Sequence, residues 1–292
     1  MGAIVVAAGL FNVCLMELRA DEDSASWKSK AISSVANPVY FEEAQIRSDI
    51  RPLFMQHDFR QSLGSSNGPI PLGGDAQLAA VQLRWAVNDR LAFIATKHGY
   101  VDFNPANTLA PDEGLVDLAV GVKYALIDNA EHEYMLTAGL RLELPIGNTS
   151  VLQGNGKGEW NPFISALKGY GDFHLSGTLG ARIPNDFADE SSMLHYSLMA
   201  DYYLHRYFIP FATVSAFTVL SEGNGLPLTA EGFDLVNFGA SSASGTTQAA
   251  VGVGFRSRLL EQVDFGFAYE WGVTGIDDIF DKRATLDFVY HF

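Results

Sequence analysis

The sequence predicts an all-β protein, a closed antiparallel transmembrane β-barrel of about 12 strands. Three observations predict this fold. Apolar residues recur with a period of two from about residue 44 onward. The connections alternate between tight turns and long loops. Beyond residues 1–16, no stretch is apolar over the roughly 18 residues that a membrane-spanning helix needs. Any passage through a membrane is therefore expected to use strands.

The alternation is clearest in residues 134–144. One face carries Tyr134, Leu136, Ala138, Leu140, Leu142 and Leu144, and the other carries Thr137, Gly139, Arg141 and Glu143. Similar segments occur at 116–126, 194–204 and 263–271. A soluble β-sandwich would also alternate, so this pattern alone does not decide the solvent.

The connections favour a membrane barrel over a sandwich. Short turns are expected at 88–89, 128–130, 169–171, 205–206 and 259–260, and long loops at 59–74, 99–114, 146–159, 184–192, 221–246 and 272–281. Strict alternation places all the long loops at one end. Outer-membrane barrels have this asymmetry, with short periplasmic turns, long external loops and an even number of strands.

Aromatic side chains mark the expected membrane interfaces. An aromatic girdle beside the short turns is predicted, with one member of the opposite girdle at Trp271. Its members are Trp85, Tyr124, Tyr134, Tyr202, Phe208 and Tyr290. The alternative is a set of aromatic residues that cap a soluble core.

The composition of the 292 residues excludes several functions. A formal net charge of -15 argues against nucleic acid as a partner, because a nucleic-acid binder needs clustered Lys and Arg. A single cysteine excludes an intrachain disulfide and a cysteine-based zinc site. The histidines do not recur with carboxylates at metal-ligand spacings. No metal and no cofactor is expected.

The first residues resemble a targeting segment. Residues 1–20 are predicted to be a signal-like leader whose recorded start lies inside a longer one, because a positive n-region is missing. Cys14 could alternatively be lipidated, although the residues before it lack the small side chains of a lipobox. Residues 21–43 are predicted to be a periplasmic linker, part of which (37–43) could plug or line the barrel mouth, and 44–292 the barrel.

The last nine residues alternate up to the terminal phenylalanine. Phe288, Tyr290 and Phe292 share one face, which resembles the signal that the outer-membrane barrel-assembly machinery reads on its clients. The strand rhythm of residues 44–292 also resembles an outer-membrane channel family associated with phenol-degradation (MetA-pathway) genes. That resemblance includes no diagnostic site, and it implies transport of small, including aromatic, solutes.

The inward face of the barrel is expected to be mixed in charge. Its side chains could be a salt-bridged structural lining, or a polar conduit whose charge pairs set selectivity. The predicted lumen-lining residues are Arg51, Arg84, Asp117, Lys123, Glu133, Arg141, Glu143, Asp172, Arg182, Asp201, Arg256, Asp264, Glu270 and Asp287. Apolar side chains on the same face, including Met55, Met199 and Phe217, suggest a pocket for a small apolar solute.

One pair of residues resembles an enzyme. His174 and Ser176 share one face of a strand, as in outer-membrane phospholipases and lipid A deacylases. Here the pair is expected to face the lumen instead of lipid, and no orienting third residue is identifiable. No catalytic residue is therefore predicted.

The function expected from the sequence is passive or facilitated passage of small solutes through the outer membrane. Its expected partners are outer-membrane lipid, the barrel-assembly machinery and small solutes, and the oligomeric state is not predicted. The alternatives are a non-conducting structural or surface-interaction barrel, an outer-membrane lipid hydrolase and a soluble lipocalin-like binder.

Overall fold

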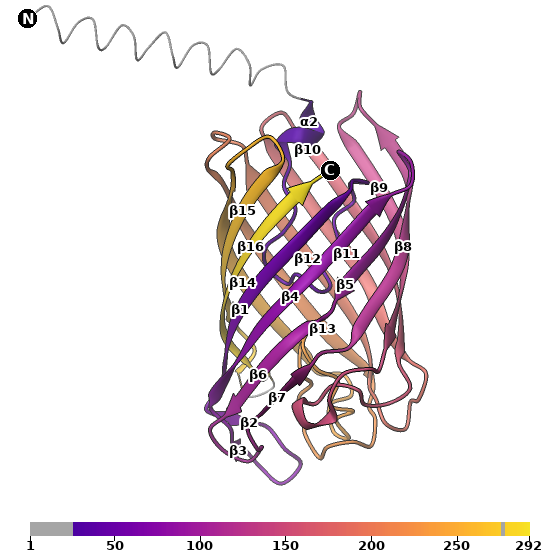
Figure 1. The fold of residues 1–292 in the computed structure, drawn as a ribbon. Helices are drawn as coiled ribbons and strands as arrows, with labels where there is room; N and C mark the ends of the chain where they lie inside the picture. The colour runs from indigo at the N-terminus through magenta and orange to yellow at the C-terminus, as the bar shows by residue number, and fades with distance from the viewer. Residues whose placement is uncertain (1–25, 276–277) are drawn as a thin grey trace, which may run out of the picture.

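A computed structural model describes residues 26–275 and 278–292 as a closed β-barrel (Figure 1). The 14 strands of the main sheet form 12 antiparallel staves, because β5 continues as β6 and β7 continues as β8. The strands are β1 (Asp49–Phe59), β4 (Gly74–Ala86), β5 (Leu91–Lys97), β6 (Gly99–Pro105), β7 (Asp112–Leu115), β8 (Leu118–Asn129), β9 (Tyr134–Leu144), β10 (Glu159–Tyr170), β11 (Phe173–Pro184), β12 (Ser192–Tyr202), β13 (Ile209–Ser221), β14 (Thr247–Arg258), β15 (Val263–Gly272) and β16 (Phe280–His291). The predicted fold class is confirmed.

The barrel closes at β1. Met55 on this strand lies opposite Thr285 of β16 on one side and opposite Leu78 of β4 on the other. Closure pairs the backbone N–H and C=O groups of the first and last staves. Lipid hydrocarbon could not offer these groups a hydrogen-bond partner.

Each strand turns charge inward and apolar side chains outward. Six arginines are among the largest fully buried side chains, whereas Leu198 of β12 is 65% exposed. In water this distribution would be unfavourable, because apolar groups would be solvated and charges desolvated. It suits a barrel with lipid outside.

The connections sort by end as predicted, with one correction. The short turns lie at the end where the chain terminates, and the longer loops lie at the opposite end (Figure 1). These loops include the small hairpin of β2 (Ser62–Leu63) and β3 (Ile70–Pro71) and the 3-10 helix η1 (Thr149–Val151). The predicted loop at 99–114 is instead β6 and β7, which pair with each other and extend the wall. The polar residues of this stretch resembled those of a loop, so the two strands were not expected.

Pro162 interrupts β10 without opening the wall. A proline has no N–H for the neighbouring strand, and the β10–β11 ladder skips this position. The side-chain amide of Asn161 donates to the Ala181 carbonyl at 2.7 Å instead. A side chain thus replaces the missing backbone donor.

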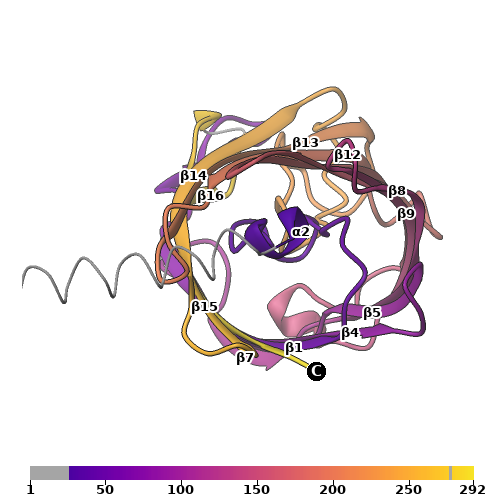
Figure 2. The same ribbon diagram turned by 90° about the horizontal axis from the view of Figure 1, so that it is seen from above.

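The N-terminal segment lies inside the barrel. We call residues 26–48 the plug segment; it begins with the short helix α2 (Trp27–Lys30) at the short-turn end and continues through the lumen (Figure 2). Residues 34–44 are buried throughout. Residues 26–43, predicted as part of a periplasmic linker that could plug the mouth at 37–43, lie inside the lumen, and the first strand of the wall begins at Asp49, five residues after the expected start at residue 44. The predicted leader, 1–20 with Cys14, lies outside the described residues.

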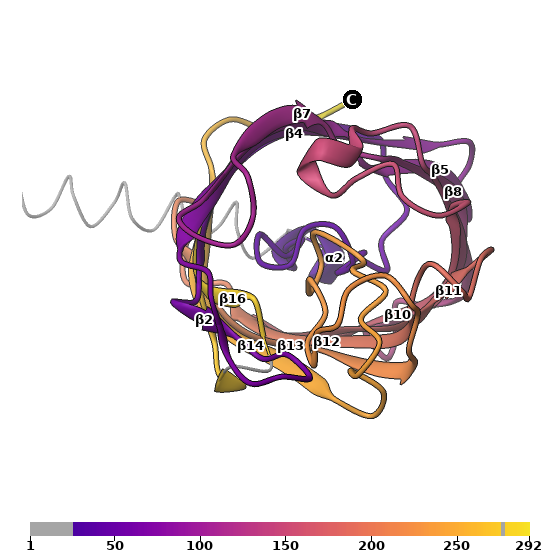
Figure 3. The ribbon, with the colours of Figure 1, turned by 90° about the horizontal axis from the view of Figure 1, so that it is seen from below.

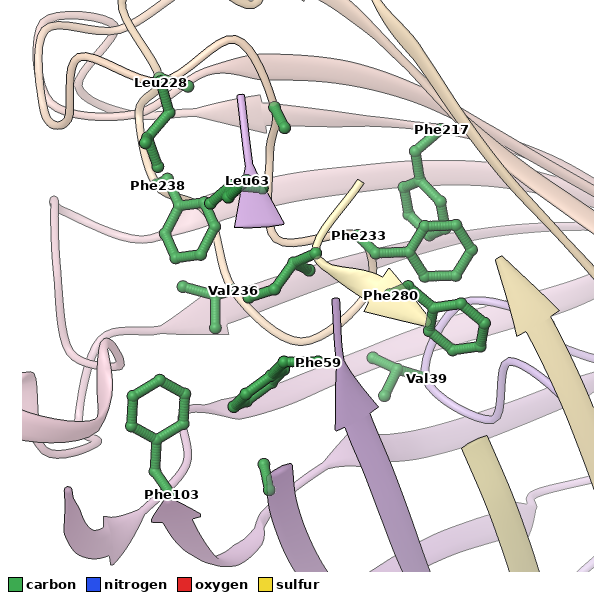
Figure 4. Packing of buried hydrophobic residues seen from close by; sticks show 14 of the residues in the cluster. Val39, Phe59, Leu63, Phe103, Phe217, Leu228, Phe233, Val236, Phe238 and Phe280 are labelled. Carbon is green, nitrogen blue, oxygen red and sulfur yellow. The ribbon is translucent and has the colours of Figure 1, made fainter. Parts of the chain in front are cut away.

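A second segment enters from the opposite end. The β13–β14 connection, residues 222–246, bends over and into the lumen, and we call it the inward loop (Figure 3). Its Phe233 stacks on Phe280 with ring centroids 5.2 Å apart. Figure 4 shows the apolar cluster in which this loop meets the wall and Val39 of the plug segment.

Among the described residues, no helix is long and apolar enough to cross a membrane.

Candidate functional site

Glu42 fastens the plug segment to the barrel wall. Its carboxylate accepts two hydrogen bonds from the Arg84 guanidinium, both 2.8 Å, and one from Lys123 Nζ at 2.7 Å. Its backbone carbonyl accepts from the hydroxyls of Ser165 and Thr178, each at 2.7 Å. One residue of the plug segment therefore binds four strands, β4, β8, β10 and β11.

Seven other carbonyls of the plug segment accept hydrogen bonds from wall side chains. Beyond α2 this segment has no helix or strand to satisfy its backbone, so buried carbonyls need other donors. The donors are Arg258 to Ala31 (3.2 Å), Arg256 to Ser33 (3.2 Å), Arg51 to Ser34 (2.8 Å), Gln82 to Pro38 (2.8 Å), Lys123 to Glu43 (3.0 Å) and Thr137 to Ala44 (2.6 Å), together with Arg141 to Val39.

Tyr40 lies between two wall cations. Its ring centroid is 5.1 Å from the Arg141 guanidinium and 5.0 Å from that of Arg182, and its hydroxyl donates to Glu159 at 3.0 Å. Arg182 also donates to Glu159, at 2.7 Å. Cation–π contacts of this kind strengthen when they are shielded from water.

The inward loop is held by a matching ion pair at the other end of the lumen. Arg283 of β16 donates to both carboxylate oxygens of Asp234 at 2.7 and 2.8 Å, and also to Glu270 of β15 at 2.9 and 3.0 Å. A second wall cluster joins Asp287 to Arg256, with two bonds of 3.0 Å, and to Arg51. Both segments that fill the lumen are therefore bound by buried charges.

The structure buries twelve of the fourteen predicted lumen residues. The other two, Glu133 and Asp172, are half-buried and lie outside the strands. They lie in turns beside β9 and β11, where Glu133 accepts from the Gly171 amide and Asp172 pairs with Lys30 of α2. Each of them directly precedes the first residue of its strand.

Besides Asp287, four of the predicted lumen acids that are buried have partners other than the plug segment or the inward loop. Asp117 accepts the backbone amides of Gly147 and Gly154 at 2.8 and 2.9 Å. The other three form pairs, which are Lys97 with Glu143, His174 with Asp201 and His291 with Asp264.

The predicted girdle residues lie on the outer surface. Six of the seven are 39 to 58% exposed, and Tyr134 is half-buried. Phe288 and Phe292, from the terminal strand signal, are also exposed.

In the enzyme-like pair, His174 has an acidic partner but is not hydrogen-bonded to Ser176. His174 Nδ1 lies 2.8 Å from Asp201, an orienting residue that sequence reasoning did not find. Its Nε2 has no hydrogen-bond partner in the part of the chain that the structure describes, so Ser176 is not bonded to it. A Ser–His–Asp relay needs that bond.

Two features escaped sequence reasoning. The first is the full extent of the plug segment: residues 37–43 were expected as a possible plug or lining of the mouth, but the rest was missed because its sequence has no periodicity. The other is a narrow pocket of about 40 Å³ between the plug segment and the inward loop, with His57 in its wall. The signal for His57 was its parity, since it shares the inward face of β1 with Met55 and Phe59.

Comparisons with known proteins find similar folds among solved structures but no similar sequence. No protein-family model and no curated protein matches this chain. A COG4313 outer-membrane channel from Pseudomonas putida F1 superimposes with a TM-score of 0.61 at 14% identity, over 85% of this chain and 96% of that one.

The fold is that of an outer-membrane β-barrel. The NanC porin superimposes with a TM-score of 0.50 at 9% identity, over 84% of this chain and 99% of the porin. The β domain of the Bordetella autotransporter BrkA gives 0.50 at 12% identity, over 84% of this chain and 100% of that one. In an outer-membrane barrel the short turns face the periplasm and the long loops face outward. In this barrel the plug segment enters at the short-turn end and the inward loop at the end of the long loops.

Proposed function

We propose that this chain is an outer-membrane channel for small solutes and that the structure is its closed state. The observation that carries the proposal is that two segments which are not part of the wall close the lumen. Polar and charged side chains of the wall bind both segments. Segments held in this way can leave without breaking the backbone pairing of the barrel.

Small, largely apolar or aromatic compounds are the proposed solutes. The pocket between the two closing segments is lined mostly by apolar side chains, among them Val39, Leu78 and Val236. The resemblance to the channel family associated with phenol-degradation genes supports the same class. With the plug segment displaced, Arg84 and Lys123 would lose Glu42 and face the lumen, where their charge would influence selectivity.

A non-conducting structural barrel is the second candidate. The density of buried ion pairs around Glu42 and Asp234 favours it, because each bond must break before a path opens. Ionic conductance separates the two candidates.

A reversible cross-link tests the channel. The side-chain nitrogen of Asn37 in the plug segment lies 3.0 Å from the Ser197 hydroxyl on β12, so a disulfide between Asn37→Cys and Ser197→Cys, made by oxidation in a Cys14→Ser background, would tether the plug segment to the wall. In planar bilayers the oxidised protein should be silent, and reductant should restore the openings of the Cys14→Ser barrel. The Asn37→Cys single variant controls for the substitution. Equal conductance with and without the cross-link would exclude gating by the plug segment, and silence of every folded variant would favour the structural barrel.

The barrel-assembly machinery is a further proposed partner. Phe288, Tyr290 and Phe292 lie outward on the last strand, where another protein can reach them. Removing Phe292 should lower the yield of folded barrel in cells, and refolding in detergent should be unaffected.

A further inference from the structure

His57 is a buried histidine without a hydrogen-bond partner. Its side chain is 1% exposed, and neither ring nitrogen is bonded to any group in the described part of the chain. Buried polar groups are nearly always paired, and leaving one unpaired costs about 1–3 kcal/mol. The imidazole of His57 therefore has both nitrogens free to bond to whatever molecule occupies the pocket.

The neighbours of His57 cannot satisfy it. The rings of Phe59 and Phe280 lie at centroid distances of 5.4 and 5.0 Å and offer no acceptor. Across the sheet it faces Ala76 of β4 and Arg283 of β16, and the guanidinium of Arg283 is engaged by Asp234 and Glu270. The remaining open direction is the pocket that His57 helps to line.

We infer that this pocket is a binding site for an uncharged, mostly apolar molecule carrying one hydroxyl, which hydrogen-bonds to His57. A neutral imidazole has one N–H donor and one bare nitrogen, and a hydroxyl can serve either. The apolar lining, with Val39, Leu78, Phe103 and Val236, disfavours a charged ligand, because a charge there would lose its hydration. The ligand class is therefore a small alcohol or phenol.

The size of the pocket connects this site to opening. At about 40 Å³ it has room for only a few waters. A ring-sized molecule must displace Val39 of the plug segment or Val236 of the inward loop, since the remaining lining belongs mainly to the barrel wall. Binding would thus push on the segments that close the lumen. This inference rests on the proposed channel function for its physiological meaning, but the binding site can be tested without it.

Nitrogen NMR of the full chain in lipid nanodiscs tests the site directly. With ¹⁵N-histidine labelling, benzyl alcohol should shift the His57 ring resonances, which His57→Phe identifies by their loss. Affinity is read from labelled Met55 and Met193 methyls, because Met55 lines the pocket and Met193 belongs to the adjoining apolar cluster. In His57→Phe, benzyl alcohol should bind about 2- to 10-fold more weakly, the value of one hydrogen bond, while toluene binding should be unchanged.

Two further variants test the hydrogen bond to His57 and the location of the site. His57→Gln retains a donor and an acceptor and should recover part of the benzyl alcohol affinity. Ala76→Phe should fill the pocket and abolish binding of both probes. The inference is overturned if benzyl alcohol leaves the His57 nitrogens unshifted, if His57→Phe weakens both probes equally, or if binding survives Ala76→Phe. A silent barrel that binds benzyl alcohol through His57 would contradict only the channel.

Discussion

Glu42 of the plug segment and Arg84 of β4 form two parallel hydrogen bonds of 2.8 Å inside the barrel, and Lys123 of β8 adds a third to the same carboxylate. The three side chains are at most 2% exposed. Buried pairs of this kind contribute little over a hydrophobic replacement, but breaking one leaves an uncompensated charge. The plug segment is therefore sensitive to the loss of this single carboxylate.

Glu42→Gln should release the plug segment while the barrel remains folded. The change leaves Lys123 without a carboxylate and Arg84 with Asp49 at 3.3 Å, and removing one partner of a buried pair costs about 3–5 kcal/mol. Hydrogen exchange at residues 31–44 should accelerate by at least tenfold, and the strands should remain protected.

An exposed ion pair on the same barrel is the matched control. Lys157 pairs with Asp186 at 2.6 Å, but the Lys157 side chain is 72% exposed. Surface pairs contribute about 0–1 kcal/mol, so Lys157→Met should leave exchange at 31–44 unchanged. Equal protection in Glu42→Gln and wild type would show that the carboxylate does not hold the segment.

The barrel itself was predictable because its strands obey one rule over ten or more residues. Parity placed Arg141 and Lys123 inside and Leu140 and Tyr124 outside without knowledge of any contact. The same rule failed at Glu133, because parity carries no signal for where a strand ends. It also could not anticipate β6 and β7, whose Asp102 and Glu113 suggested a loop.

The contents of the lumen were not predictable in this way. Each contact between the plug segment and the wall joins residues far apart in the chain, such as Asn37 with Ser197 and Tyr40 with Glu159. An aperiodic segment reveals such partners only in three dimensions. Parity indicates which charged side chains point inward, but it carries no information on the second segment that they bind.

Asp234→Asn should free the inward loop. Asp234 gives Arg283 two of its four carboxylate contacts, and Glu270 would still neutralise the arginine. Faster hydrogen exchange is therefore expected at residues 231–240, with little change in the plug segment. The exposed Glu222, in the same loop, supplies the control variant Glu222→Gln. Release of both segments by Asp234→Asn would mean that they open as one unit.

Glu190 should make the external loops sensitive to pH. Burial, followed by the charge of Glu159, raises the pKa of Glu190 from 4.5 to about 8. The packed loop thus holds a proton that an open loop releases, so its stability falls as pH rises from about 4.5 and levels off above about 8. Opening of residues 185–191, followed by hydrogen exchange corrected for its intrinsic pH dependence, should increase by up to tenfold per pH unit in that window. Glu190→Gln should remove the dependence, and its persistence would point to another group.

Leu198 tests whether the apolar belt contacts lipid. It lies near the middle of β12 and is 65% exposed, so Leu198→Arg should cost about 2–4 kcal/mol in the free energy of unfolding from phospholipid vesicles. Leu260, 63% exposed in the turn between β14 and β15, is the control for depth. Because a charge near the interface retains water, Leu260→Arg should cost about 0–1 kcal/mol. Equal costs at the two positions would mean that no hydrocarbon surrounds β12, since only an apolar surrounding phase distinguishes the middle of the strand from its end.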